Sequence, residues 1–206
     1  MVGKSIKWGY SVNTFKGVSI FNLTVKKSKF LGFGYRVDSI EEAEEIISSL
    51  KNKFYDAKHI VYAYKIGDNI VRKENSSEPS GTASVPILAV IENSNLTNTL
   101  ILIIRYFGGA LLGASNLYRA YSDTAVGVVK NGEIVTLNKY YKFVAEVSYV
   151  EYAKLNSYAN KTNDLVILDG TFETVIKIIF AVKEGTSNKE ILNLINGKES
   201  KETIWL

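Results

Sequence analysis

Residues 99–130 read TLILIIRYFGGALLGASNLYRAYSDTAVGVVK, and this stretch decides the fold of the first part of the chain. Its first eight residues are almost all apolar, which is typical of a buried strand bounded by turn residues. Gly108 and Gly109 follow and let the backbone turn tightly. From residue 113 to residue 130, apolar residues recur at helical spacing. The stretch therefore predicts a buried strand that turns into a long helix.

Toward the N-terminus, strand-like and helix-like patterns alternate. Strand patterns cover residues 19–25, 30–37, 59–66 and 70–72, and helix patterns cover residues 40–54 and 84–92. Ser39, with Glu42 three residues later, predicts a capping box for the first of these helices. A polar loop at residues 75–84 separates the last strand pattern from the second helix. This alternation predicts a layered α+β domain.

Toward the C-terminus, a second and shorter unit follows. Strand patterns at residues 141–149, 165–173, 174–183 and 203–206, with helix patterns at 150–161 and 187–196, give the order βαββαβ. That order is the ferredoxin-like split βαβ motif. The balance of charge also changes near Lys139. We therefore predict two domains, residues 1–138 and residues 139–206.

The composition excludes several classes of function. Among 206 residues there is no cysteine and only one histidine, His59, which excludes thiol catalysis, disulfide frameworks and multi-histidine metal sites. We expect no metal and no cofactor. The longest aliphatic run, Leu100–Ile104, is far shorter than the ~20 residues of a membrane helix. Residues 1–15 contain no apolar segment of a secretory signal, so we expect a cytoplasmic protein without membrane contact.

The net charge of +4 is unevenly distributed. Residues 1–139 hold 17 Lys and Arg against 12 Asp and Glu, whereas residues 140–206 hold 8 against 9. The first 37 residues contain seven basic residues, no acidic residue and several interleaved aromatic residues. This pattern is compatible with contact to nucleic acid, because basic side chains attract phosphates and aromatic rings stack on bases. The alternative is a solvated strand face above a buried aromatic face.

A candidate anion site surrounds the turn that follows the buried strand. Arg105 lies at the carboxyl end of this strand, and Gly113 opens a helix whose first amide groups favour an anion. Arg119 in that helix and Glu78 in the preceding polar loop complete the set. The alternative is structural: glycines also allow a helix to pack closely on a sheet, and Glu78 with Arg105 can form a simple ion pair.

Four sequence elements together resemble the signature of the IMPACT/YigZ family. They are Ser28-Lys29-Phe30, His59 with Ala63-Tyr64, Glu78-Pro79-Ser80-Gly81-Thr82-Ala83, and the run from Arg105 through Tyr121. The resemblance implies a bacterial- or archaeal-type member with two domains. It implies a first domain similar to domain IV of elongation factor G, with a ribosomal-protein-like βαβ fold, and a ferredoxin-like second domain similar to domain V. Eukaryotic relatives regulate translation.

The chain departs from the family pattern in two places. Asn75-Ser76-Ser77 stands where the family commonly has acidic residues, so we expect any metal or base function of those acids to be missing here. Ala114-Ser115-Asn116 stands where a glycine pair is often found, so Gly113 is the only glycine at this point. We therefore expect the backbone around the candidate anion site to be more rigid than in the family.

Three functions are compatible with these residues. The first is a regulatory protein that binds RNA or the ribosome through phosphates, without catalysis. Its candidate nucleic-acid contacts are Lys58, Arg72, Lys73, Arg105 and Arg119, and its candidate ligand contacts are His59, Glu78, Ser80, Arg105, Gly108, Gly109, Gly113 and Arg119.

The second is a hydrolase or transferase acting on a phosphate- or carboxylate-bearing substrate. A serine nucleophile needs an imidazole base and an orienting carboxylate, for which Ser80, His59 and either Glu78 or Asp56 are the candidates. The third is regulation through protein contacts alone, with the nearly neutral second domain as the docking module.

Overall fold

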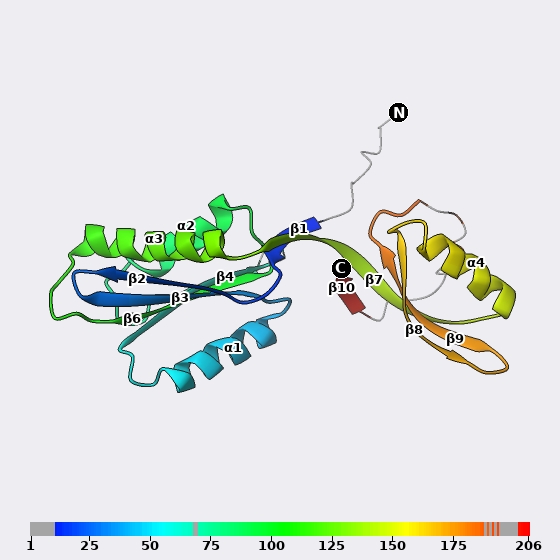
Figure 1. The fold of residues 1–206 in the computed structure, drawn as a ribbon, viewed down its shortest axis with the longest axis horizontal. Coiled ribbons are helices and arrows are strands. Elements are labelled where there is room, and N and C mark those ends of the chain that lie inside the picture. The colour runs from blue at the N-terminus through cyan, green and yellow to red at the C-terminus, as the bar shows by residue number, and fades with distance from the viewer. Residues whose placement is uncertain (1–10, 68–69, 188, 190, 192, 194–201) are drawn as a thin grey trace, which may run out of the picture. The chain divides into compact units, whose positions relative to one another are not determined.

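The computed structural model describes residues 11–67, 70–187, 189, 191, 193 and 202–206 (Figure 1). Residues Val12–Thr136 form one compact unit, and the described residues from Leu137 onward belong to a second. The chain passes from the first unit to the second within the strand β7 (Ile134–Val147). We describe each unit separately.

The first unit is built on an antiparallel sheet of five strands in the order β2-β3-β6-β4-β5. Their bounds are β2 (Ser19–Val25), β3 (Ser28–Arg36), β4 (His59–Ile66), β5 (Ile70–Glu74) and β6 (Thr99–Tyr106). The central strand β6 is buried from its first residue through Arg105, which confirms the buried strand predicted from the sequence.

Helices cover both faces of this sheet (Figure 1). The helix α1 (Ile40–Lys53) packs on one face, where Ala43, Ile47 and Leu50 are buried. The helices α2 (Ser84–Asn93) and α3 (Ala114–Asn131) pack on the other face against a separate core that includes Tyr121. The sheet therefore has an apolar core on each side, which explains why β6 carries an unbroken apolar run.

The capping box predicted for α1 is only half formed. The Ser39 side chain accepts the backbone N–H of Glu42 at 3.2 Å, as predicted. The Glu42 carboxylate, however, accepts the backbone N–H of Asp38 and not that of Ser39. A second capping box, between Ser148 and Glu151, begins the helix α4 (Tyr149–Ala159) and was not predicted.

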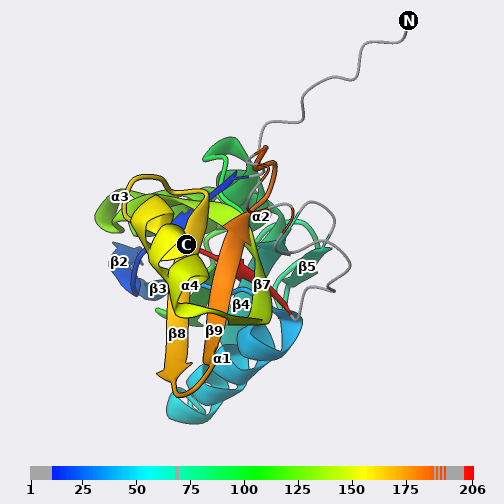
Figure 2. The ribbon, with the colours of Figure 1, turned by 90° about the vertical axis from the view of Figure 1, so that its right-hand side faces the viewer.

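The second unit also contains an antiparallel sheet. β10 (Glu202–Trp205), β7, β9 (Ile176–Lys183) and β8 (Leu165–Phe172) lie in this order, which is the order that the split βαβ motif produces. α4 covers one face of β8 and β9 and buries Leu155 there (Figure 2). The helix predicted at residues 187–196 lies largely outside the described residues. A mixed α+β fold in two units is thus confirmed.

The largest differences from the prediction are at the strands β1 and β7. The short strand β1 (Ser11–Phe15) was not predicted, because its alternating Ser-Val-Asn-Thr-Phe pattern is too short to stand out. β7 begins at Ile134 and not at Tyr141, because the β-branched run that starts there already favours a strand. Among the described residues, no helix is long and apolar enough to cross a membrane.

Candidate functional site

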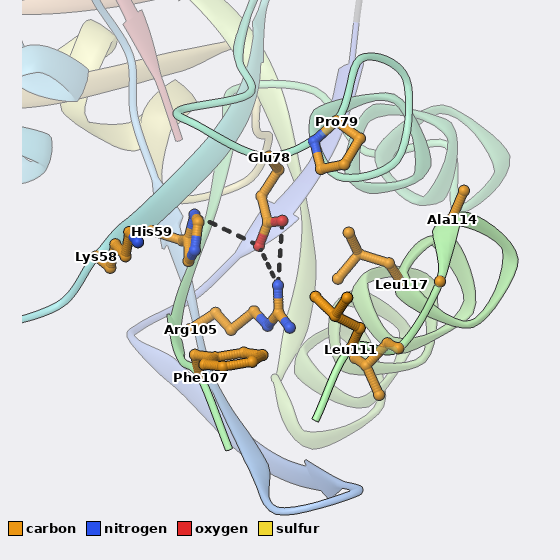
Figure 3. Close-up of a pocket in the computed structure, with 11 residues that line it drawn as sticks. Lys58, His59, Glu78, Pro79, Arg105, Phe107, Leu111, Ala114 and Leu117 are labelled. Carbon is orange, nitrogen blue, oxygen red and sulfur yellow. Dashed lines mark hydrogen bonds and ion pairs between the residues drawn. The ribbon is translucent and has the colours of Figure 1, made fainter. Parts of the chain in front are cut away.

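A cavity of about 390 Å³ lies in the first unit beside the carboxyl end of β6 (Figure 3). The start of β4, the loop before α2 and the start of α3 form its other walls. The residues that line it are Lys58, His59, Glu78, Pro79, Arg105, Phe107, Leu111, Leu112, Gly113, Ala114 and Leu117. Five of these are large apolar residues or proline, so the walls are mainly apolar with one charged corner.

That corner is a buried ion pair between Glu78 and Arg105. The Arg105 Nη1 donates to both carboxylate oxygens of Glu78, at 2.8 Å and 3.1 Å. The two side chains are only 2% and 6% exposed, respectively, so the pair is almost completely removed from water. The sequence predicted this ion pair as the structural alternative to an anion site. Both of its residues also line the cavity.

Further side chains hold the ion pair in place. Tyr121 donates its hydroxyl to Glu78 Oε1 at 2.8 Å. Burial raises the pKa of Tyr121, and the Glu78 charge raises it further, so this hydroxyl stays protonated and remains a donor. The rings of Phe30 and Phe107 lie 5.6 Å and 5.7 Å from the Arg105 guanidinium carbon, within cation–π range.

His59 lies opposite Arg105 in the register of β4 and β6. Its Nδ1 is 3.0 Å from Ser77 Oγ and 3.7 Å from Glu78 Oε1. Burial lowers the pKa of His59, and this effect outweighs the opposite influence of Glu78, while Arg105 and Lys58 lower it further. The imidazole is therefore neutral at neutral pH, and its contact with Glu78 is not an ion pair.

This geometry does not form the catalytic relay considered as an alternative. A relay needs the nucleophile on one imidazole nitrogen and the orienting carboxylate on the other. Here Ser77 and Glu78 both approach Nδ1. Ser80 is exposed and does not line the cavity, and Asp56 accepts the Tyr106 hydroxyl at 2.8 Å.

Gly108 and Gly113, in the loop between β6 and α3, are required for different structural reasons. Gly108 presses against the hairpin between β2 and β3: an added Cβ would lie 2.1 Å from the Lys27 carbonyl carbon and 2.3 Å from the Ser28 nitrogen. The Gly108 N–H donates to Ser28 Oγ at 3.1 Å. Gly113 has φ 79° and stands at the N-cap of α3, which has no side-chain cap and no acidic residue in its first turn.

The structure brings together only some of the predicted site residues. His59, Glu78, Arg105 and Gly113 line the cavity together with Lys58. Ser80, Gly108, Gly109 and Arg119 do not line it. Arg119 is exposed on α3 because it lies about 200° around the helix from Leu117, which faces the cavity.

The two basic residues predicted on β5 lie elsewhere. Arg72 pairs with Glu44 of α1 at 2.9 Å, and both side chains are substantially exposed. Lys73 is its exposed neighbour and also lies outside the cavity lining. Neither residue contributes to the site around Arg105.

Several residues of the site were not predicted. Ser77 was noted only as a departure from the family, and Tyr121 only as the last residue of a family motif, yet Ser77 contacts His59 and Tyr121 contacts Glu78. The Ser28-Lys29-Phe30 element was the available signal for Ser28 and Phe30. No group of His, Cys, Asp and Glu residues within the described part of the chain has the arrangement of a metal site.

Comparisons with known proteins agree with this structure. The family model described as the Impact N-terminal domain matches residues 26–129. The chain is 37% identical over 129 residues to the IMPACT family member YvyE of Bacillus subtilis, a match that covers 59% of each protein and so less than two-thirds of that relative. It is 26% identical over 175 residues to an IMPACT family member of Haemophilus influenzae, covering 83% of this chain and 84% of that protein.

The fold also matches a solved structure described only as "Crystal structure of an hypothetical protein". The TM-score is 0.67 at 19% sequence identity, and the match covers 95% of this chain and 96% of that one. The likeness therefore extends over both units as a fold. Because the Impact N-terminal domain covers residues 26–129, the chain belongs to the IMPACT family, as its motifs predicted.

Proposed function

We propose that this member of the IMPACT family is a translation-related regulatory protein whose first unit binds the phosphate backbone of RNA. The link to translation follows from the family, whose eukaryotic members regulate translation. The RNA contact rests on one observation. Four exposed lysines surround the end of the sheet where the cavity lies, and within the described residues none of them forms an ion pair: Lys26, Lys27, Lys29 and Lys58.

The register of the sheet supports this grouping. Lys26 and Lys27 form the turn between β2 and β3, and Lys29 pairs across β3 and β6 with Tyr106. Lys58 precedes β4 and lines the cavity. The close approach of Gly108 to the Lys27 backbone brings the hairpin against the loop after β6. Unpaired lysines at one end of a domain attract phosphates without reading sequence.

The conformation of the hairpin turn supports the same function. Lys26 and Lys27 both have positive φ, 44° and 66°. Turns with two such residues strongly prefer Asn-Gly, because most side chains are strained there by on the order of 1 kcal/mol each. Two adjacent lysines at these positions place two positive charges at the tip of the β2–β3 hairpin and destabilise the turn. Backbone strain of this kind is concentrated at functional sites.

Arg105 takes a different part from the one expected for a phosphate contact. Its guanidinium is bound to Glu78 and lies within cation–π range of two aromatic rings, with 6% of the side chain exposed. A phosphate backbone requires accessible donors. We therefore assign the phosphate contacts to the lysines and the shaping of the cavity to Arg105.

The experiment is a salt series of RNA binding with two charge-matched variants. Lys29→Ala combined with Lys58→Ala removes two of the four lysines, and Lys51→Ala combined with Lys53→Ala removes two exposed lysines of α1 as the control. For single-stranded RNA, each lost contact should reduce the slope of log affinity against log salt by about 0.7. The control should leave the slope unchanged.

Two results would count against the proposal. Equal losses in both double variants would mean that only net charge matters and that no lysine site exists. Binding that does not respond to salt would point to a protein partner in place of phosphates. Co-sedimentation with ribosomes over the same salt series extends the measurement to the expected cellular target.

A further inference from the structure

We propose that the cavity holds one nucleotide of a single-stranded RNA, with its base between the apolar walls and its phosphate at the start of α3. This inference rests on the proposed function and adds a ligand to it. The lysines at the hairpin and at Lys58 would hold neighbouring phosphates, while the cavity would take a single unpaired nucleotide.

The walls of the cavity suit a flat, largely apolar group. The volume of about 390 Å³ lies in the range of small-molecule pockets. Pro79, Leu112 and Leu117 line it, and Leu111 and Phe107 leave 87% and 48% of their surface exposed. In Figure 3, Leu111 and Leu117 lie beyond the tip of Arg105, with Phe107 beside its stem. Exposed apolar side chains beside a cavity favour burial of a ligand.

Phe107 supplies a stacking surface. Aromatic side chains bind unpaired bases of RNA by stacking, and they do so for every base because each base has a π-face. Phe107 is 48% exposed and lines the same cavity as Lys58. A base stacked on Phe107 and a neighbouring phosphate at Lys58 can therefore be bound at the same time.

The phosphate end of the site is the start of α3. This helix has 18 residues, and its first turn lacks both a side-chain cap and an acidic residue. Gly113 and Ala114 line the cavity, so the free amide groups of the first turn lie at its edge. The positive end of the helix dipole favours an anion there.

The charged corner of the cavity also contains a buried donor without a partner. The Arg105 Nη1 donates to Glu78, but its Nε has no hydrogen-bond partner among the described residues. Only 6% of the side chain is exposed, so water does not replace that partner. Buried donors without a partner are rare, and one in a cavity wall is typical of polar groups that serve a site.

The test compares single-stranded RNA with a duplex of equal length, using the full-length protein. Phe107→Ala and Leu111→Ala remove apolar surface beside the cavity. The control is Val71→Ala, which removes an exposed apolar side chain of β5, away from the cavity. Loss of one stacked base should weaken single-stranded binding about ten-fold in Phe107→Ala. Leu111→Ala should weaken it less, and neither variant should change duplex binding or the salt slope. Leu111 is so exposed that its replacement leaves folding intact.

Calorimetry with uridine 5′-monophosphate separates this inference from the proposed function. The mononucleotide should bind the unmodified protein more tightly than ribose 5-phosphate, and Phe107→Ala should remove the difference. If RNA binds in a salt-dependent way but neither apolar variant affects it, the nucleotide site is refuted and the lysine site stands. If the mononucleotide binds at Phe107 while RNA does not bind, the proposed function fails and the nucleotide site stands. If neither ligand binds, both are refuted.

Discussion

The first unit buries polar side chains, and the second does not. All the buried polar and charged side chains among the described residues lie between Thr14 and Thr124, and they include His59, Glu78 and Arg105. The buried side chains of the second unit are aliphatic or aromatic, as in the cluster around Phe180.

This difference separates what stabilises a fold from what shapes a site. Removing a polar group from water is unfavourable unless it is fully partnered, and an apolar pair of the same size is often as stable as a buried ion pair. The second unit avoids this unfavourable term, because its described core consists of aliphatic and aromatic side chains. The first unit keeps Glu78 and Arg105 in the wall of its cavity, which is the arrangement expected where the polar groups serve a ligand.

Removing one member of the buried ion pair should have the largest effect. Arg105→Ala leaves Glu78 buried and unpaired, so we expect the free energy of unfolding to fall by about 3–5 kcal/mol. Denaturant unfolding measures this loss. The double variant Glu78→Leu with Arg105→Met is the control, because an apolar pair should recover most of the stability. Unchanged stability in Arg105→Ala would show that the pair is not buried in solution.

A substitution in the apolar core of the second unit should be similarly severe but local. Phe180 is fully buried, and Phe180→Ala should destabilise the second unit by about 3–5 kcal/mol through loss of packing. We also predict that the units unfold separately, so that calorimetry shows one transition moved and the other, together with RNA binding, unchanged. Equal displacement of a single transition would refute the separation into two domains.

Tyr121→Phe should have an intermediate effect. The variant keeps the ring that packs edge-on against Phe30 but removes the hydrogen bond to Glu78. A hydrogen bond to a charged group contributes about 1–3 kcal/mol, which is the loss expected in denaturant unfolding. Tyr141→Phe in the second unit, where the hydroxyl donates to the partly exposed Glu184, should lose clearly less.

His59 should make the stability of the first unit depend on pH. Its pKa is lower in the folded protein than the 6.5 of the free side chain, so the unfolded chain takes up a proton first as the pH falls. The stabilising contribution is therefore complete above pH 6.5 and is lost as the pH falls through the folded pKa. Unfolding curves between pH 5 and 7.5 should show this loss, and His59→Gln should flatten it. An equal slope in both proteins would contradict the assignment.

The exposed ion pair of the first unit should matter least. Arg72 and Glu44 lie 2.9 Å apart, almost the same distance as Arg105 and Glu78, but their side chains are 56% and 38% exposed. Exposed pairs often contribute nothing measurable. Arg72→Ala should leave the unfolding midpoint unchanged, and a loss comparable to that of Arg105→Ala would show that burial is not the cause of the difference.

Most of the strands and helices could be predicted from the sequence, because the patterns that indicate them lie within a single stretch of residues. The buried strand, the turn and the following helix are contained in residues 99–130, and the structure has them as β6 and α3. Glu78 and Arg105 could be grouped because the family motifs name both. The start of β7 was predicted too late, since the β-branched run at Ile134 follows the turn at Asn131-Gly132 and continues into the strand without a break before Tyr141.

The remaining site residues could not be found this way because their contacts depend on tertiary packing. Ser77 reaches His59 across 18 residues of sequence, and no spacing rule relates a loop to the start of a strand. Arg119 was grouped with Arg105 by its position in the motif. The helix rotates by about 100° per residue, however, so the cavity receives Leu117 and Arg119 points to solvent.

The contact between Gly108 and the hairpin has an evolutionary consequence. A side chain at position 108 would collide with the backbone of Lys27 and Ser28, which cannot move away as a side-chain tip does. Gly113 has open space around it, but its φ of 79° and ψ of 155° form a backbone conformation that is essentially restricted to glycine. Among descendants, glycine at position 108 should be lost only together with a remodelled hairpin, whereas glycine at position 113 should be lost only together with a changed backbone at the start of α3.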